Sequence, residues 1–197
     1  MDQDFKEIEV KFQLDNSNMN ILQDWLTKNT KYEGEVSYSD YYLDNPDSTF
    51  FYMASGGYKD ILQFVRIRTS LEKNFICYKN THITEEGKTL YCDEYETEVK
   101  DGNISLKIFT ALGYTGQIVL NKKRKTYTTK EFDVVIDDVE GLGIFVEVEL
   151  KNHELDGIAK LHKYLKDIGI KKIKQFDRGY ICMKVNPNYD FGTDIIL

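Results

Sequence analysis

The chain has 197 residues, of which 41% are hydrophobic and 30% charged, which suits one globular domain with a sizeable core and excludes a disordered protein. The formal net charge of −7 argues against a nucleic-acid partner, although it allows a local basic pocket. The start of the chain lacks the apolar stretch of a signal peptide, and no run is apolar enough to span a membrane, so we expect a cytoplasmic protein without membrane contact. The 3 cysteines have no C-x-x-C spacing, which argues against a disulfide framework or a zinc site.

Period-two alternation of apolar and polar residues predicts strands with two different faces. In chain order these strands cover residues 6–13, 63–69, 75–79, 92–100, 119–127, 132–138 and 143–151. Helical spacing of apolar residues predicts helices over residues 18–28, 103–112 and 155–168, the first capped by Ser17 or Asn18 and the others followed by Gly113 and Gly169. Residues 45–60 are expected to form a long loop, and residues 185–197 a surface tail.

Clean alternation is typical of antiparallel strands, because strands buried in parallel sheets are apolar on both faces. We therefore expect an α+β fold, built as a single domain over residues 1–197. The polar faces of these strands are unusually rich in charge, and like charges repeat two residues apart on one face, where they repel each other. The charged sets are Glu7, Glu9 and Lys11; Arg66 and Arg68; Glu94, Glu96 and Glu98; Lys122 and Arg124; and Glu147 and Glu149.

A closed barrel would resolve this repulsion, because its inward faces bring carboxylates and basic groups from different strands together. Buried charges need partners, and a polyanion bound with divalent cations satisfies both signs. Carboxylate oxygens suit Mg²⁺ or Mn²⁺, Mg²⁺ commonly bridges phosphate oxygens, and Arg and Lys neutralise the remaining phosphate charge. The pattern therefore favours a site for a polyanion and divalent cations inside such a barrel.

Several short motifs follow one another along the chain, beginning with Glu7-Ile-Glu9-Val-Lys11, an E-x-E-x-K strand. The others are Tyr41-Tyr-Leu-Asp44, Arg66-Ile-Arg68, Lys79, the Glu94–Glu98 strand, Leu112-Gly-Tyr114, Lys122-Lys-Arg-Lys-Thr-Tyr127 and the segment from Asp137 to Glu149. Taken in this order, they resemble the motifs of the CYTH superfamily, the triphosphate tunnel metalloenzymes, which include class IV adenylyl cyclases and thiamine triphosphatases. The last two segments look most similar to the class IV cyclase branch, often labelled CyaB-like.

The resemblance implies a closed eight-stranded antiparallel β-barrel with flanking helices and the triphosphate at its centre. It implies metal ligands among Glu7, Glu9, Glu147 and Glu149, and catalytic roles for Glu7, Glu9, Lys11 and Asp137. It also implies that phosphates contact Lys11, Arg66, Arg68, Lys79, Lys122 and Arg124, and Arg178 is a further candidate contact from a segment that resembles the C-terminal strand of the family. The family suggests a homodimer.

Two reactions fit the same scaffold. In cyclisation, the ribose 3′-hydroxyl attacks the α-phosphate of ATP and pyrophosphate leaves, whereas in hydrolysis water attacks the terminal phosphorus of thiamine triphosphate or inorganic triphosphate. The difference is about one phosphate spacing, which the sequence does not resolve. The primary expectation is a cyclase, the alternative is a triphosphatase, and a non-enzymatic polyphosphate-binding module is a third hypothesis.

Overall fold

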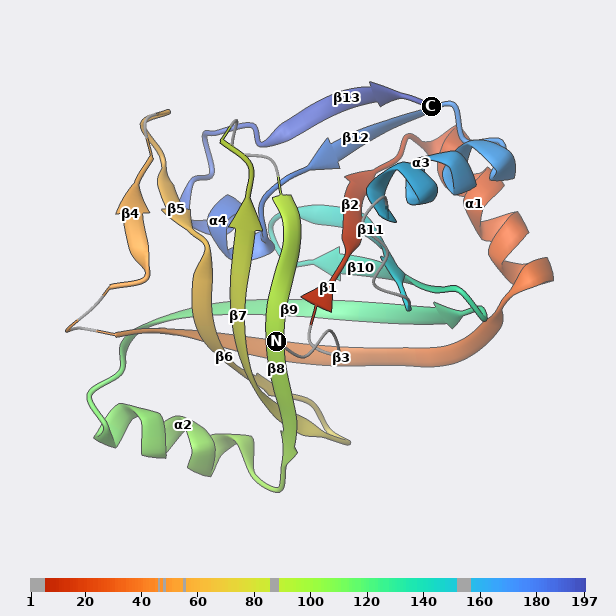
Figure 1. Cartoon of the computed structure of the whole chain (residues 1–197). Helices are drawn as coiled ribbons and strands as arrows, with labels where there is room; N and C mark the ends of the chain where they lie inside the picture. The colour runs from red at the N-terminus through yellow and green to blue at the C-terminus, as the bar shows by residue number, and fades with distance from the viewer. Residues whose placement is uncertain (1–5, 46, 48, 55, 86–88, 152–156) are drawn as a thin grey trace.

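The computed structural model describes residues 6–45, 47, 49–54, 56–85, 89–151 and 157–197, without the side chains of residues 6, 7, 116 and 117. Within these residues the fold is dominated by an 11-stranded antiparallel sheet in the order β1-β8-β7-β6-β3-β9-β10-β11-β2-β12-β13, and β4 and β5 form a separate hairpin (Figure 1). The α+β expectation is confirmed. No helix of the described part is long and apolar enough to cross a membrane.

The elements follow one another along the chain as strands interrupted by short helices. The strands are β1 (Lys6–Glu7), β2 (Glu9–Gln13), β3 (Lys31–Asp44), β4 (Phe51–Met53), β5 (Lys59–Ile61), β6 (Gln63–Thr69), β7 (Asn74–Ile83), β8 (Thr89–Val99), β9 (Thr115–Thr128), β10 (Phe132–Val139), β11 (Gly143–Leu150), β12 (Lys172–Phe176) and β13 (Gly192–Ile196). The helices are α1 (Asn16–Asn29), α2 (Gly102–Ala111), α3 (Gly157–Ile168) and α4 (Tyr180–Val185).

The structure differs from the expected closed barrel of eight strands. Within the described residues, the main sheet has 11 strands, and its strand order runs from β1 at one edge to β13 at the other. The N-terminal strand is divided at Ile8 into two short pieces that pair with different neighbours. Glu7 of β1 stands opposite Cys92 of β8, whereas Glu9 of β2 stands opposite Glu149 of β11. One short segment of chain thus connects β8, near one end of the strand order, with β11, near the other. The long β3–β9 pair extends across the molecule, and β6, β7 and β8 cross it steeply (Figure 1).

Two large apolar clusters pack helices against the sheet. The larger one packs α1 and α3, through Leu22, Leu26, Leu161 and Leu165, against strand residues such as Val148. The second surrounds α4, which buries Ile181, Cys182 and Met183 with residues of β3, β6, β9 and β11. A third, smaller cluster places α2 against Leu43, Val65 and Ile67.

Helix ends follow local rules only in part. Asp15, and not Ser17 or Asn18, caps α1, because its side chain accepts a hydrogen bond from the Asn18 backbone N–H at 2.8 Å. Gly113 and Gly169 follow α2 and α3 with positive φ angles of 95° and 103°, as expected of helix stops. Leu155, the predicted start of the third helix, lies outside the described residues, and α4 was not predicted.

Two segments that were expected to be irregular form strands. Residues 45–60, predicted as a long loop, contribute β4 and most of β5, which pair with each other. In the predicted tail, Gly192–Ile196 forms β13 at the edge of the sheet beside β12. The β4–β5 hairpin and the C-terminal segment also contact each other, because the ring of Tyr58 lies 4.5 Å from that of Tyr189 and 4.9 Å from that of Phe191.

Candidate functional site

A cavity of about 410 Å³ opens among the charged faces of the sheet. Alternation along the strands places one set of side chains in it, since residues two apart share a face. Most of the predicted site residues line this cavity: Glu9, Lys11, Arg66, Arg68, Lys79, Lys122, Arg124, Glu147, Glu149 and Arg178. Asp137 lies behind the wall with its side chain fully buried, and the side chain of Glu7 lies outside the described part of the structure.

Strand register explains why like charges two residues apart are tolerated. Lys11 of β2 stands opposite Glu147 of β11, and their Nζ and Oε1 atoms are 3.0 Å apart. Arg124 of β9 likewise stands opposite Asp137 of β10, and its Nε donates to Oδ1 at 2.7 Å. At these two positions a charge faces the opposite charge on the next strand, which offsets repulsion along a strand by attraction across the sheet.

Asp137 anchors a buried network beneath the cavity. Its Oδ2 accepts hydrogen bonds from Lys122 Nζ at 2.9 Å and from the hydroxyl of Tyr180 at 3.1 Å. Burial raises the pKa of Asp137, but the charges of Lys122 and Arg124 outweigh burial and hold it below the ordinary value. With its oxygens bound by these donors, Asp137 is placed to orient the basic side chains around it.

Glu147 is held in the same way by two cations. It bonds Lys11 through one oxygen and the Arg124 guanidinium through the other, at 2.6 Å. Burial works against its ionisation, yet Lys11 and Arg124 keep the pKa of Glu147 well below its usual value. Burial also lowers the pKa of Lys11, but Glu147 and Glu9 outweigh burial and raise it. Both groups are therefore charged at neutral pH.

Arg66 and Arg68 present guanidinium groups from β6. Arg68 is fixed by Asp40 of β3, whose oxygens accept from Nε at 2.7 Å and from Nη2 at 2.9 Å, with both side chains buried. Arg66 donates from Nη2 to Glu96 at 3.0 Å and to Glu94 at 3.4 Å. Within the described part of the structure, its buried Nε has no hydrogen-bond partner. A buried donor of this kind suits an anionic ligand.

Lys122 lies between guanidinium groups and is almost fully buried. Burial, followed by the positive charges of Arg124 and Arg68, lowers the pKa of Lys122 to about 8, although Asp137 and Asp40 act in the other direction. An anion that entered the cavity would favour its charged form. Around Lys122, the positive charges of the neighbouring arginines therefore outweigh the negative charges of Asp137 and Asp40.

Glu9 and Glu149 form the acidic part of the cavity. They stand directly opposite each other on β2 and β11, and the Oε1 of Glu9 is 3.2 Å from the Nζ of Lys11. Burial, followed by the charge of Glu9, raises the pKa of Glu149 to about 7. Two hard oxygen donors that repel each other suit a divalent cation, which would remove the repulsion.

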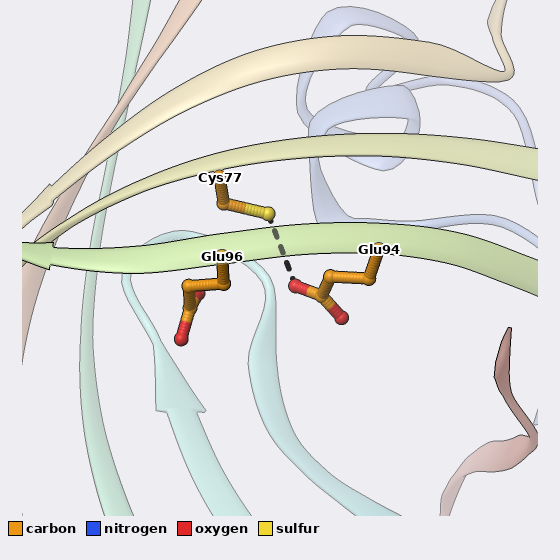
Figure 2. A group of neighbouring side chains, drawn as sticks. All are labelled: Cys77, Glu94 and Glu96. Atoms are coloured by element: carbon orange, nitrogen blue, oxygen red, sulfur yellow. Dashed lines mark hydrogen bonds between the residues drawn. The ribbon is translucent and has the colours of Figure 1, made fainter. Parts of the chain in front are cut away.

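A second group of possible donors comprises Cys77 of β7 and Glu94 and Glu96 of β8 (Figure 2). The Sγ of Cys77 donates to Glu94 at 3.0 Å, and burial, together with that carboxylate, raises the pKa of this thiol to about 12. Both glutamates also bind Arg66. The thiol and the two carboxylates together make a hydrogen-bonded support for Arg66.

Arg178 lines the cavity, but its donors are engaged by protein groups. Its Nε donates to both oxygens of Asp60, at 2.9 and 3.1 Å, and its Nη1 donates to the carbonyl of Asp177. Asp60 is 1% exposed and belongs to the β4–β5 hairpin. The segment around Arg178 leads into α4, whereas the sequence resemblance implied a strand there.

With this geometry defined, comparison with known proteins is informative. A family model described as the CYTH domain matches residues 6–180 of the chain. The chain belongs to the CYTH family. The match includes every strand that lines the cavity and ends at Tyr180, the first residue of α4.

Among CYTH-like relatives, a Methanocaldococcus jannaschii protein named "Putative adenylate cyclase" is 25% identical over 182 residues, which is 90% of this chain and 98% of that protein. A Pyrococcus horikoshii protein of solved structure has a TM-score of 0.70 and 24% identity, covering 92% of this chain and 99% of the other. A Hippeastrum structure described as a "Putative adenylyl cyclase" with a dominant triphosphatase activity has a TM-score of 0.62 and 16% identity, with coverage of 93% and 97%. The two structures support the fold.

Several residues at the site were not predicted as site residues. Asp40, Glu94 and Glu96 orient the arginines of β6, and the ring of Tyr180 lies 4.7 Å from Lys11 Nζ and 5.2 Å from Lys122 Nζ. The alternation of Glu94 and Glu96 was visible in the sequence. Asp40 and Tyr180 had no such signal, because their partners are distant in the chain.

Proposed function

We propose that this CYTH protein is a divalent-cation-dependent enzyme that acts on the triphosphate of a nucleotide and, like class IV adenylyl cyclases, converts ATP to cyclic AMP and pyrophosphate. The observation that carries this proposal is the cavity in which Arg66, Arg68, Lys122 and Arg124 stand around a space that Glu9 and Glu149 also reach. Strong positive charge beside a repelling carboxylate pair is the arrangement that a metal-bound triphosphate requires.

The residues present fit Mg²⁺ or Mn²⁺. Mg²⁺ is typically held by one or two carboxylates together with substrate phosphates, and Glu9 with Glu149 supplies that number. The raised pKa of Glu149 supports this assignment, because it reflects a charge that the neighbouring protein cations do not satisfy. Glu147 and Asp137, held by lysine and arginine, are assigned to orientation of the phosphate-binding side chains. A bound cation would polarise the phosphate that is attacked and stabilise charge on its oxygens.

The protein groups would act mainly by positioning and charge. Arg66, Arg68 and Arg124 bind phosphate oxygens and hold the chain of phosphates extended, while Glu147 and Asp137 keep Lys11 and Arg124 in place. In cyclisation, the ribose 3′-oxygen bonds to the α-phosphorus as the bond from that phosphorus to the bridging oxygen breaks. Pyrophosphate and the hydroxyl proton are then released. Preorganised positive charge lowers the energy of this step, because it need not reorganise as charge develops.

Hydrolysis by a triphosphatase, acting on thiamine triphosphate or inorganic triphosphate, is the second candidate. The Hippeastrum protein of similar fold is described as having a dominant triphosphatase activity, which supports this second candidate. The same cavity supports both reactions, because the outcome depends on which phosphorus lies beside Glu9 and Glu149.

The test is product analysis with the purified protein. ATP, thiamine triphosphate and inorganic triphosphate are incubated separately with Mg²⁺ or Mn²⁺, and the products are identified by chromatography. Cyclic AMP and pyrophosphate from ATP support the cyclase. Orthophosphate without cyclic nucleotide assigns the protein to the triphosphatases. Tight binding without turnover of any substrate contradicts both reactions and leaves a polyphosphate-binding module.

A further inference from the structure

Helix α2 is apolar on its outward face as well as on the face that packs against the sheet. Its inner residues Leu106 and Phe109 pack against the small apolar cluster of β3 and β6. On the outward face Ile104 is 49% exposed, Ile108 is 53% exposed, and Leu112, directly after the helix, is 71% exposed. A surface helix ordinarily turns polar residues outward, and a helix that is apolar all round is ordinarily buried. The composition of α2 is therefore that of a helix with a partner on each face.

The helices α1 and α3 follow the ordinary rule. Exposed positions of α1 include Asp24 and Lys28, and those of α3 include Lys163 and Asp167. In α2, by contrast, Lys107 is the single charged residue among 10. Figure 1 shows α2 below the strands β6 to β8, away from α1, α3 and α4. No other helix of the described residues therefore explains the outward apolar side chains of α2.

Two further exposed apolar side chains flank α2 on the same side of the sheet. Tyr95 of β8 stacks on Tyr78 with 6.1 Å between the ring centroids, and Tyr78 packs against the cluster beneath α2. Val119 of β9 stands opposite Tyr41, which packs against the same cluster, and directly opposed residues share a face of the sheet. We use the term outer patch for the exposed side chains of Tyr95, Ile104, Ile108, Leu112 and Val119.

The outer patch lies on the side of the sheet that faces away from the cavity. Along β6, Arg66 and Arg68 line the cavity, whereas Val65 and Ile67 belong to the cluster beneath α2. Successive residues of a strand point to opposite faces, so α2 covers the back of the wall that holds these arginines. A partner on the outer patch therefore does not compete with a ligand in the cavity.

The spacing of the α2 residues makes the outer patch complementary to itself. Ile104, Ile108 and Leu112 are spaced four residues apart, so in an antiparallel copy of the helix Ile108 meets Ile108 and Ile104 meets Leu112. Two-fold dimers use the same surface of both subunits in this way.

The charge of the chain favours the same partner. With a net charge of −7, two copies repel each other over most of their surface, so contact between copies is most favourable where there is little charge. A membrane surface would instead favour a cluster of lysines and arginines, and α2 has only Lys107.

We propose that the outer patch is the interface of a homodimer in which two copies of α2 pack antiparallel across a two-fold axis beside Ile108. Tyr95 and Val119 flank the helix pair and enlarge the contact toward the area of about 800 Å² per partner that a stable interface buries. Three exposed side chains of one helix cover less than this area, so we expect a dissociation constant in the micromolar range. The cavity of each subunit remains open on the far side of its sheet.

The test is sedimentation equilibrium of the full chain at concentrations between about 1 and 200 µM, which bracket micromolar affinity. The wild type should form dimers as its concentration rises. Ile108→Glu should weaken dimerisation about tenfold or more, because it places two carboxylates against each other at the two-fold axis. Ile108→Lys should weaken it similarly through two ammonium groups. An equimolar mixture of the two variants should restore the dimer, since opposite charges then meet at the axis.

Ile196→Glu is the matched control, because Ile196 is 77% exposed on β13 and lies outside the outer patch. It should dimerise like the wild type, and circular dichroism establishes that each variant is folded. A wild type that stays monomeric throughout this concentration range overturns the homodimer. Dimerisation of Ile108→Glu at wild-type strength, or equal weakening by Ile196→Glu, contradicts the interface on the outer patch. Folded Ile108 variants that stay monomeric when mixed contradict the antiparallel pairing at Ile108.

Discussion

Glu9 of β2 and Glu149 of β11 stand directly opposite each other across an antiparallel strand pair, where two carboxylates repel. In the same strand pair, by contrast, the neighbouring Lys11 and Glu147 join opposite charges. Burial, followed by the repulsion from Glu9, raises the pKa of Glu149 to about 7. A cation bound between the two carboxylates would remove their repulsion and favour the ionised form of Glu149.

Divalent cations should therefore stabilise the protein more at alkaline than at acidic pH. A carboxyl whose folded-state pKa is raised binds a proton more tightly when folded, so its contribution to stability is present below the unfolded pKa and is lost as pH rises through about 7. Without metal, this group should make the melting temperature fall between about pH 5 and 8. Mg²⁺ should raise the melting temperature more at pH 8 than at pH 5.5, as measured by calorimetry. An equal shift at both pH values would contradict this assignment.

Binding of triphosphate should take up a proton near pH 8. Lys122 has a pKa of about 8, so about half of the molecules carry an uncharged Lys122 at this pH, and bound phosphate would favour the charged form. Calorimetric titration in two buffers of different ionisation enthalpy measures this proton uptake. Affinity should decline as pH rises above 8. If the apparent enthalpy is the same in both buffers at pH 8, the depressed pKa of Lys122 has no part in binding.

Asp40→Asn should strongly destabilise the protein. The change removes the charge that fixes the buried Arg68 guanidinium, and breaking a buried ion pair typically costs about 3–5 kcal/mol. Glu98→Gln is the control, because Glu98 pairs with Lys73 where both side chains are more than half exposed, and the free energy of unfolding should change by less than about 1 kcal/mol. Urea denaturation measures both. Similar values for the two variants would show that Asp40 does not hold Arg68 as described.

Cys77 should resist alkylation in the folded protein. Its thiol is buried, donates to Glu94, and has a pKa of about 12, so little thiolate forms at pH 8. Iodoacetamide treatment followed by mass spectrometry should find Cys77 unmodified until the protein is denatured. Rapid native modification would mean that the thiolate is accessible, and would reopen the Cys77–Glu94–Glu96 cluster as a metal site.

The sequence predicted those strands in which apolar and polar residues alternate, so that one face is buried in the core and the other is charged. Residues 63–69 form β6 as predicted, because Val65 and Ile67 are buried on one face and Arg66 and Arg68 line the cavity on the other. β12 was missed because Lys172 and Lys174 make its sequence appear to be a solvated charged run. The β4–β5 hairpin was missed because its strands are short, and contacts with the distant C-terminal segment hold it in place.

The candidate site was predictable as a set of inward charges but not as a set of roles. Spacing placed Lys122 and Arg124 on one face, and the structure confirms that both line the cavity. The partner of each charge depends on strand register, which is fixed by long-range pairing. For that reason, spacing alone did not distinguish Glu149, which faces another carboxylate, from Glu147, which is neutralised by Lys11 and Arg124.

The rate of metal-dependent triphosphate consumption by Glu149→Gln, compared with that of Glu98→Gln, tests the central claim most directly. The two substitutions remove the same charge, one inside the cavity and one at an exposed ion pair. We predict that Glu149→Gln lowers the rate about 100-fold or more while Glu98→Gln matches the wild type, with both variants folded. A Glu149→Gln protein that turns over triphosphate at the wild-type rate would contradict the account of this cavity as the metal-dependent active site.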